Sequence, residues 1–144
     1  MSHKLKMVLA CVAASLVAGL IISALYATAS VENAQRREVR AIYLEFVETL
    51  ARKDFVSAAN FMEPNYRNLL LTKKGYMDAF SLEFSSLAKP EIYPKGNECI
   101  KITDGAAVVS VGNTENLGYL YEVSFIKHES SWLMSGSLQL ITGG

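Results

Sequence analysis

An uncharged apolar run dominates the start of the chain. Residues 7–26 read MVLACVAASLVAGLIISALY and hold no charged side chain. At about 1.5 Å per residue this run spans about 30 Å as a helix, which is the thickness of the hydrocarbon core of a bilayer. The pattern predicts a transmembrane helix over residues 7–26, preceded by a short tail at residues 1–6 and followed by one exported domain at residues 27–144.

The basic residues around this run predict its orientation. Lys4 and Lys6 precede it, and the next basic residue is Arg36. The positive-inside rule then places the N-terminus in the cytoplasm. We expect a single-pass protein of the inner membrane whose C-terminal domain is periplasmic or extracellular.

A cleaved signal peptide is the alternative interpretation. Ala27-Thr28-Ala29 is a good A-x-A processing site. The apolar part of a signal peptide usually has about 7–15 residues, so an apolar run of this length favours an uncleaved anchor. If the chain were cut after Ala29, the domain would be released from the membrane.

Small side chains recur at a spacing of four residues inside the apolar run. They are Ser15, Gly19 and Ser23. This spacing allows two membrane helices to approach closely, so these residues are candidates for a helix–helix contact in the bilayer.

A helical apolar period begins after the membrane segment. One stripe with the i, i+3, i+4 spacing is formed by Val39, Ile42, Tyr43, Phe46, Val47 and Leu50. Glu48 and Arg52 lie off this stripe as an i,i+4 ion pair. Between Gly19 and Lys53 there is neither Pro nor Gly. We therefore expect one helix from Met7 to Lys53.

Shorter helices follow. Asp54 is placed to cap a helix that Pro64 ends, and residues 65–71 form another turn or two. Gly75 breaks the chain before a third helix, which Pro90 closes. The predicted inward face of that helix carries Tyr76, Ala79, Phe80, Phe84 and Leu87.

After Pro90 the period changes to that of strands. Strands are predicted at residues 99–103, 106–111, 119–127 and 131–141, with turns at Asp104-Gly105 and residues 128–130 and a loop at residues 112–116. Because the helices come first and the strands follow in sequence, we expect an α+β fold. Its helices pack on one face of a curved antiparallel sheet of about four strands.

Two sequence features resemble the nuclear transport factor 2-like domains. The segment from Lys53 to Ala59, KDFVSAA, is similar to the opening of their second helix. The segment from Tyr121 to Met134, in which Trp132 starts the last strand, resembles their final hairpin. The resemblance covers about residues 32–141 and implies a cone-shaped domain with a cavity between the first helix and the sheet. A single membrane helix before such a domain is similar to the periplasmic assembly subunit of type IV secretion systems, although those subunits usually carry a larger domain and a longer tail.

Composition excludes several classes of function. Fourteen Lys and Arg balance fourteen Asp and Glu, so no basic excess favours nucleic acid. The two histidines, His3 and His128, are predicted on opposite sides of the membrane, and no pair of residues has the spacing of metal ligands. The cysteines Cys11 and Cys99 are separated in the same way. We expect no cofactor and no metal.

The predicted interior of the cone offers few catalytic groups. Its candidate pocket-lining residues are Tyr43, Phe46, Phe80, Phe84, Tyr121 and Trp132. Asp54 is explained by capping, and Asp78, Glu83 and Glu122 are expected on polar surfaces, so no catalytic residue is assigned.

The function expected from these features is a non-catalytic interaction domain on a membrane anchor. Its partners are the lipid bilayer, other subunits of a bacterial membrane or secretion complex, and in one version a second copy of the chain. The alternative is a periplasmic small-ligand-binding protein or a ketosteroid isomerase-like enzyme, released by cleavage after Ala29. The alternative requires an open cavity of about 300 Å³ or more.

Overall fold

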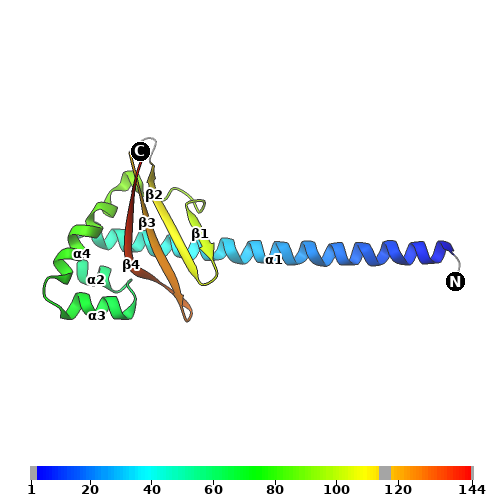
Figure 1. Ribbon diagram of the computed structural model, residues 1–144, viewed down its shortest axis with the longest axis horizontal. Helices are drawn as coiled ribbons and strands as arrows, with labels where there is room; N and C mark the ends of the chain where they lie inside the picture. The colour runs from blue at the N-terminus through cyan, green and yellow to red at the C-terminus, as the bar shows by residue number, and fades with distance from the viewer. Residues whose placement is uncertain (1–2, 114–117, 144) are drawn as a thin grey trace. The chain divides into compact units, whose positions relative to one another are not determined.

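A computed structural model describes residues 3–113 and 118–143 of the chain (Figure 1). The chain divides into two compact units, Met1–Ala34 and Gln35–Gly144. The described part of the first unit is helical, and the second unit combines helices with a sheet. The architecture is α+β, as predicted.

Helix α1 extends from His3 to Ala51 and contributes to both units. The predicted helix from Met7 to Lys53 is therefore confirmed as far as Ala51. Residues 28–33, where helix propensity is weak, are helical, and the Thr28 hydroxyl donates to the Ala24 carbonyl oxygen at 2.9 Å. The helix ends at Ala51, and two residues later Lys53 adopts a positive φ of 58°.

The apolar stripe predicted on the later part of α1 is confirmed. Its buried members are Val39, Tyr43, Phe46, Val47 and Leu50, and Ile42 is half-buried. The ion pair between Glu48 and Arg52 is present at 4.0 Å. Both of these side chains are largely exposed, so the pair contributes little to stability.

The short helices follow α1 closely. They are α2 (Phe55–Ala59), α3 (Pro64–Thr72) and α4 (Tyr76–Phe84), with the 3₁₀ turns η1 (Ser85–Ala88) and η2 (Pro90–Ile92). Asp54 caps α2 as predicted, because its carboxylate accepts a hydrogen bond from the Ser57 N–H at 3.1 Å.

Two predictions about these helices are wrong in detail. Pro64 does not end a helix; it begins α3, because the first helical position requires no N–H donor. On α4, Phe80 and Phe84 face inward, but Tyr76 is 45% exposed and Ala79 is also exposed. The helix turns to 3₁₀ at Ser85, so Leu87 still reaches the interior.

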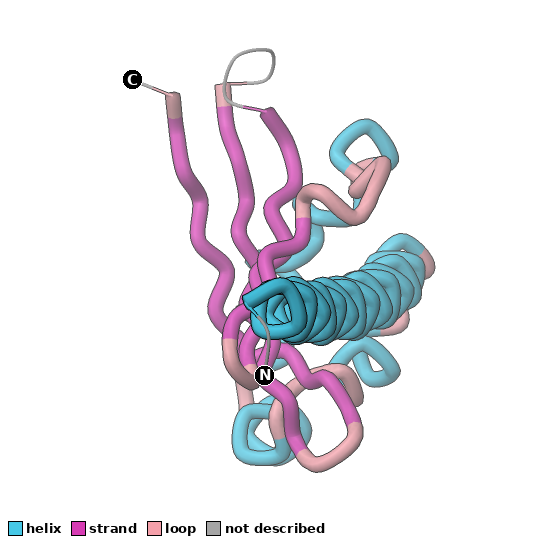
Figure 2. Tube along the Cα trace, turned by 90° about the vertical axis from the view of Figure 1, so that its right-hand side faces the viewer, coloured by secondary structure: helices cyan, strands magenta, loops and turns pink. Residues whose placement is uncertain are grey.

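Four antiparallel strands form one open sheet in the order β1-β2-β3-β4. They are β1 (Ile100–Thr103), β2 (Ala106–Asn113), β3 (Tyr119–His128) and β4 (Ser131–Thr142). Each predicted strand is confirmed within two residues. Gly112 and Asn113, predicted in a loop, belong to β2, and residues 114–116 of that loop lie outside the described residues. Figure 2 shows the strands side by side, with helical segments against one face.

The pairing of β3 with β4 changes register in the middle. Phe125 lies opposite Met134, whereas Val123 lies opposite Leu138, so β4 has two extra residues in this interval. Gly136 lies in the interval with a φ of +77°, which favours glycine. A Cβ at this position would lie 2.5 Å from the Tyr66 ring, so the ring and the backbone pack closely.

Candidate functional site

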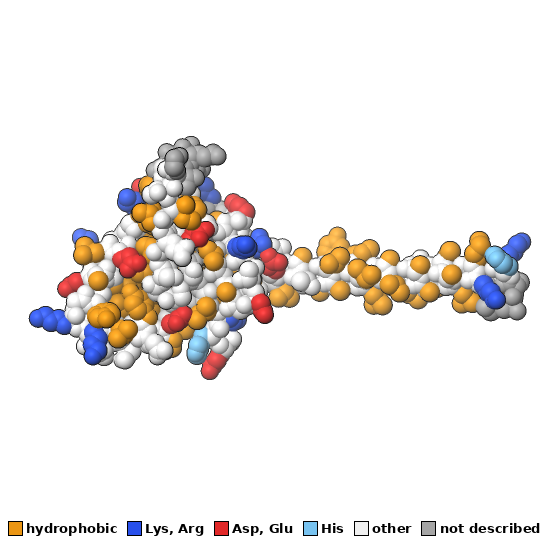
Figure 3. Space-filling view, in the orientation of Figure 1, with side chains coloured by type: hydrophobic (Ala, Val, Ile, Leu, Met, Phe, Trp, Pro, Cys, Tyr) orange, Lys and Arg blue, Asp and Glu red, His pale blue; other side chains and the backbone are white. Residues whose placement is uncertain are grey.

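The first unit presents an exposed apolar surface. Its apolar window is long enough to cross a membrane, and none of that window is buried (Figure 3). Large side chains such as Leu16, Leu20 and Leu25 are 65–70% exposed. Water disfavours so much apolar surface on a helix, and a bilayer accommodates it. This unit is consistent with a single-pass membrane protein.

The predicted helix-contact residues lie on this surface. The Ser15 hydroxyl donates to the Cys11 carbonyl, and the Ser23 hydroxyl donates to the Gly19 carbonyl, both at 2.9 Å. A Cβ added at Gly19 would meet nothing within 4 Å. The two hydroxyl groups are therefore satisfied within the helix, and the backbone at Gly19 is open to a neighbouring helix.

The second unit brings most of the predicted pocket residues together. Phe46 of α1 lies at the centre, with ring centroids 5.9 Å from Phe84, 6.5 Å from Phe80 and 5.8 Å from Phe61. Phe80 and Phe84 are 4.8 Å apart. These edge-to-face and tilted contacts are the arrangements that aromatic rings prefer in a packed core.

Four of the predicted pocket residues have no accessible surface. Tyr43, Phe46, Phe80 and Phe84 are 0% exposed, and Trp132 is 2% exposed. A side chain with no accessible surface touches no space that holds a water molecule, either inside or outside the protein. In this conformation these residues pack against one another and against the sheet.

Tyr121 differs from the others because it is only half-buried. Its ring lies 5.4 Å from that of Tyr119, in an edge-to-face contact. Tyr121 pairs across the sheet with Leu140 of β4, which is 56% exposed. Tyr121 therefore belongs to a partly open apolar area at the end of the sheet.

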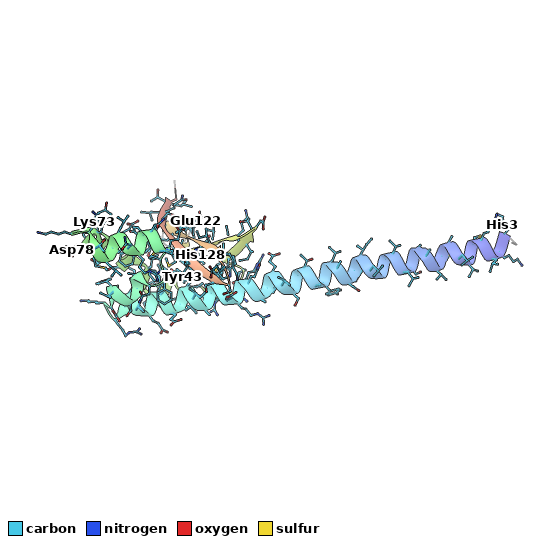
Figure 4. The ribbon with its side chains drawn as sticks, turned by 90° about the horizontal axis from the view of Figure 1, so that it is seen from below. His3, Tyr43, Lys73, Asp78, Glu122 and His128 are labelled. Carbon is cyan, nitrogen blue, oxygen red and sulfur yellow. The ribbon has the colours of Figure 1, made fainter. Side chains whose placement is uncertain are left out.

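The hydroxyl of Tyr43 is buried with no hydrogen-bond partner among the described residues. Figure 4 shows Tyr43 inside the second unit. Burial raises the pKa of this hydroxyl above its ordinary value, and the nearby Tyr93 and Cys99 raise it further. A tyrosine that holds its proton so firmly is a poor general base.

The cysteine of this region is a free thiol. Cys99 is half-buried just before β1, and its thiol donates to the Gly96 carbonyl at 3.0 Å. Burial raises the pKa of the thiol, and Glu98 raises it further. A protonated thiol is a weak nucleophile, so this environment favours a packing role.

The acidic residues weighed from the sequence lie away from the aromatic cluster. Asp78 and Glu83 are exposed on α4. Glu122 is half-buried on β3 and accepts a weak hydrogen bond from the Ser110 hydroxyl at 3.5 Å. Hydrogen bonding from the Ser57 side chain, and then from the Ser57 backbone N–H, lowers the pKa of Asp54. Within the described ranges, no three His, Cys, Asp or Glu residues form a group that could hold a metal ion.

A polar cluster that the sequence did not indicate joins α1 to the last hairpin. The indole N–H of Trp132 donates to Glu38 Oε2 at 3.2 Å, and Lys127 Nζ lies 3.5 Å from the same oxygen. The Lys127 ammonium also lies 4.9 Å from the centre of the Trp132 ring. Glu38 and Trp132 are 94 residues apart in the sequence, so no local sequence pattern predicts this contact.

In comparisons with protein-family models, with curated proteins and with solved structures, no match to this chain was found.

Proposed function

We propose that this chain is a single-pass membrane protein whose second unit is a non-catalytic interaction domain. It would serve as a subunit or assembly factor of a bacterial membrane or secretion complex. The observation that carries the proposal is the contrast between the two units. The first exposes an apolar helix that suits a bilayer, and the second has all of its predicted pocket residues except Tyr121 packed into a core.

The charge distribution supports an N-terminus in the cytoplasm of such a protein. Lys4 and Lys6 lie before the apolar run, and the run itself has no charge. The domain would then lie in the periplasm or outside the cell. The order of helices and antiparallel strands is also compatible with the nuclear transport factor 2-like fold that we propose for it.

The alternative is a soluble periplasmic binder or a ketosteroid isomerase-like enzyme, released by cleavage after Ala29. Both require space between α1 and the sheet. The complete burial of Tyr43, Phe46 and Phe84 weighs against that space. The high pKa of Tyr43 weighs against its use as a base.

Intact mass tests whether the anchor is retained. The protein would be purified from membranes together with a matched variant carrying Ala27→Leu and Ala29→Leu, in which the processing site is abolished. We expect full-length mass for both. If the natural sequence loses residues 1–29 and the variant does not, the chain is processed and the membrane-anchor proposal fails.

Thiol labelling tests the orientation. In a background without native cysteines, His3→Cys and Ser130→Cys would be treated with a membrane-impermeant thiol reagent in spheroplasts. Ser130 lies in the exposed turn between β3 and β4. We expect labelling of Ser130→Cys only, and labelling of both after lysis. The reverse pattern would place the domain in the cytoplasm.

Cross-linking in native membranes, followed by affinity purification in mild detergent, tests the interaction role. We expect specific cross-linked species that contain this chain. Recovery of the free monomer under every condition would contradict the proposal.

A further inference from the structure

The outer edge of β4 is only partly covered. At Met134 it pairs with the segment before α3, because the Met134 N–H donates to the Phe61 carbonyl at 2.8 Å and the Glu63 N–H donates to the Met134 carbonyl at 2.9 Å. Beyond Gly136, none of the described residues pairs with this edge. In Figure 2, β4 is the strand that leads to the C mark, and it lies at the outer side of the sheet.

The free part of this edge directs backbone groups outward. Met134 lies opposite Phe125 and points its N–H and C=O outward, so this is a non-hydrogen-bonded pair of the β3–β4 ladder. Val123, two residues before Phe125 on β3, lies opposite Leu138. Because alternate residues of a strand point the same way, Leu138, Leu140 and Thr142 also present their backbone groups to the open edge.

This edge lacks the features that usually prevent strand pairing. Residues 135–143 read SGSLQLITG and contain no charge and no proline. Leu140 is 56% exposed and Ile141 is 39% exposed. By contrast, β1 at the other edge has four residues, among them the exposed Lys101. Natural proteins protect an open edge with short strands and charged residues, so an uncharged edge indicates a pairing surface.

We propose that the Leu138–Thr142 edge of β4 pairs with the same edge of a second copy of this chain, in antiparallel orientation across a two-fold axis. This inference rests on the proposed interaction role and names the partner. The absence of charge in the segment argues for a second copy, because two identical uncharged strands bring no like charges together when they pair.

The register that suits the side chains is centred on Gln139. It places Leu138 opposite Leu140 of the copy in hydrogen-bonded pairs, so the outward backbone groups of both chains are satisfied. It also places the two Gln139 amides opposite each other, and each amide can donate to the other and accept from it. On the helix-covered face, the added strand extends the apolar area of Tyr121 and Leu140. Membrane anchoring raises the effective concentration of copies, which allows so short a pairing to form.

A cysteine scan tests this pairing in the full chain, in native membranes and in the Cys11→Ala, Cys99→Ser background. Gln139→Cys should form a disulfide dimer, because Cα atoms of a non-hydrogen-bonded antiparallel pair are about 4.5 Å apart, within disulfide range. Ile141→Cys alone should not cross-link to itself, because its copies are separated by about 13 Å along the strands. A mixture of Ser137→Cys and Ile141→Cys chains should form the mixed disulfide.

A charge exchange distinguishes loss of pairing from loss of folding. In detergent, Gln139→Lys or Gln139→Glu alone should lower the dimer-to-monomer equilibrium constant up to about fivefold, because like charges oppose each other. Co-expression of the two variants should restore a heterodimer, which a misfolded domain cannot do. The fluorescence of Trp132 reports folding in each case.

Failure of every single cysteine from Leu138 to Thr142 to cross-link overturns the proposal. So does a cross-link at Gln139 to a different protein, although that result leaves the interaction role intact. Cleavage after Ala29 instead contradicts the proposed function, and the intact-mass measurement detects it separately.

Discussion

Replacing Tyr43 with Phe should stabilise the second unit, although it removes a polar group from the core. The Tyr43 side chain is 0% exposed, and its hydroxyl has no hydrogen-bond partner among the described residues. In the unfolded chain this hydroxyl bonds to water. Folding therefore removes a hydrogen bond and does not replace it.

The magnitude follows from two opposing terms. A buried polar group without a partner costs about 1–3 kcal/mol. Removing the oxygen leaves a small void of about 10 Å³, which costs about 0.2 kcal/mol at about 24 cal/mol per Å³. The net effect of Tyr43→Phe is a gain of about 1 kcal/mol or more in the free energy of unfolding, which raises Tm by about 3–6 °C for a domain of this size.

The difference should grow at alkaline pH. Burial raises the pKa of Tyr43 in the folded state above 10.0. Below pH 10 the group is protonated in both states, so its contribution does not change with pH. As the pH rises above 10, only the unfolded state releases the proton, and the natural protein loses stability by up to about 1.4 kcal/mol per pH unit. Tyr43→Phe lacks this loss.

Urea denaturation of the full chain in detergent micelles measures both effects. The single tryptophan, Trp132, is 2% exposed and reports unfolding of this unit. Tyr119→Phe, at a half-buried position, is the matched control and should change the unfolding free energy by less than about 0.5 kcal/mol. If Tyr43→Phe instead destabilises the protein by about 1 kcal/mol, the hydroxyl has a hydrogen-bond partner, and the reasoning fails.

Three further substitutions test other contacts. Glu38→Ala should lower the free energy of unfolding, measured by circular dichroism, by about 1 kcal/mol, because the Trp132 indole loses its hydrogen-bond acceptor. Glu45→Ala, at an exposed position of the same helix, should have little effect. Equal effects of the two substitutions would contradict the role of Glu38. Gly136→Ala should destabilise the protein more than Gly105→Ala, because both glycines have a positive φ but, of the two, only Gly136 lacks space for a Cβ. Equal losses of stability would show that the Tyr66 ring moves to make room for the Cβ. Asp54→Ala should lower the urea midpoint at pH 7. That difference should disappear as pH falls through the lowered pKa of Asp54, because the carboxylate stabilises the fold only when it is ionised, and a difference that persists in strong acid would refute the capping argument.

Local patterns in the sequence were sufficient for most elements of this protein, although they did not show that Pro64 begins a helix or that Gly112 and Asn113 belong to β2. The candidate membrane-spanning helix is recognised by its length and its lack of charge, and the later stripe of α1 is recognised by its 3.6-residue period. Both properties are readable from neighbouring residues, as is the cap at Asp54. The positions of the strands could be predicted from the alternation of apolar and polar residues and from the turn at Gly105. The α+β class then followed from the order of the elements, with helices first and strands after them.

The tertiary structure decided which faces are covered. The period of α4 grouped Tyr76 with Phe80 on one stripe, but how wide a stripe is buried depends on the neighbours that pack against it. The lack of a hydrogen-bond partner for the Tyr43 hydroxyl among the described residues likewise could not be predicted from the sequence, because the partners of a buried group come from distant parts of the chain.

The candidate interaction edge also required the fold. Strand alternation indicates that β4 is a strand, and it gives no information about which strands lie at an edge. Only the observed order of strands, and the pairing of Phe61 and Glu63 with Met134, show that residues 138–142 have no pairing partner at this edge among the described residues. Sequence alone determines the chemistry of this segment, which is uncharged and largely apolar. Long-range pairing determines that no described residue bonds to its outward backbone groups, which can therefore bind another strand.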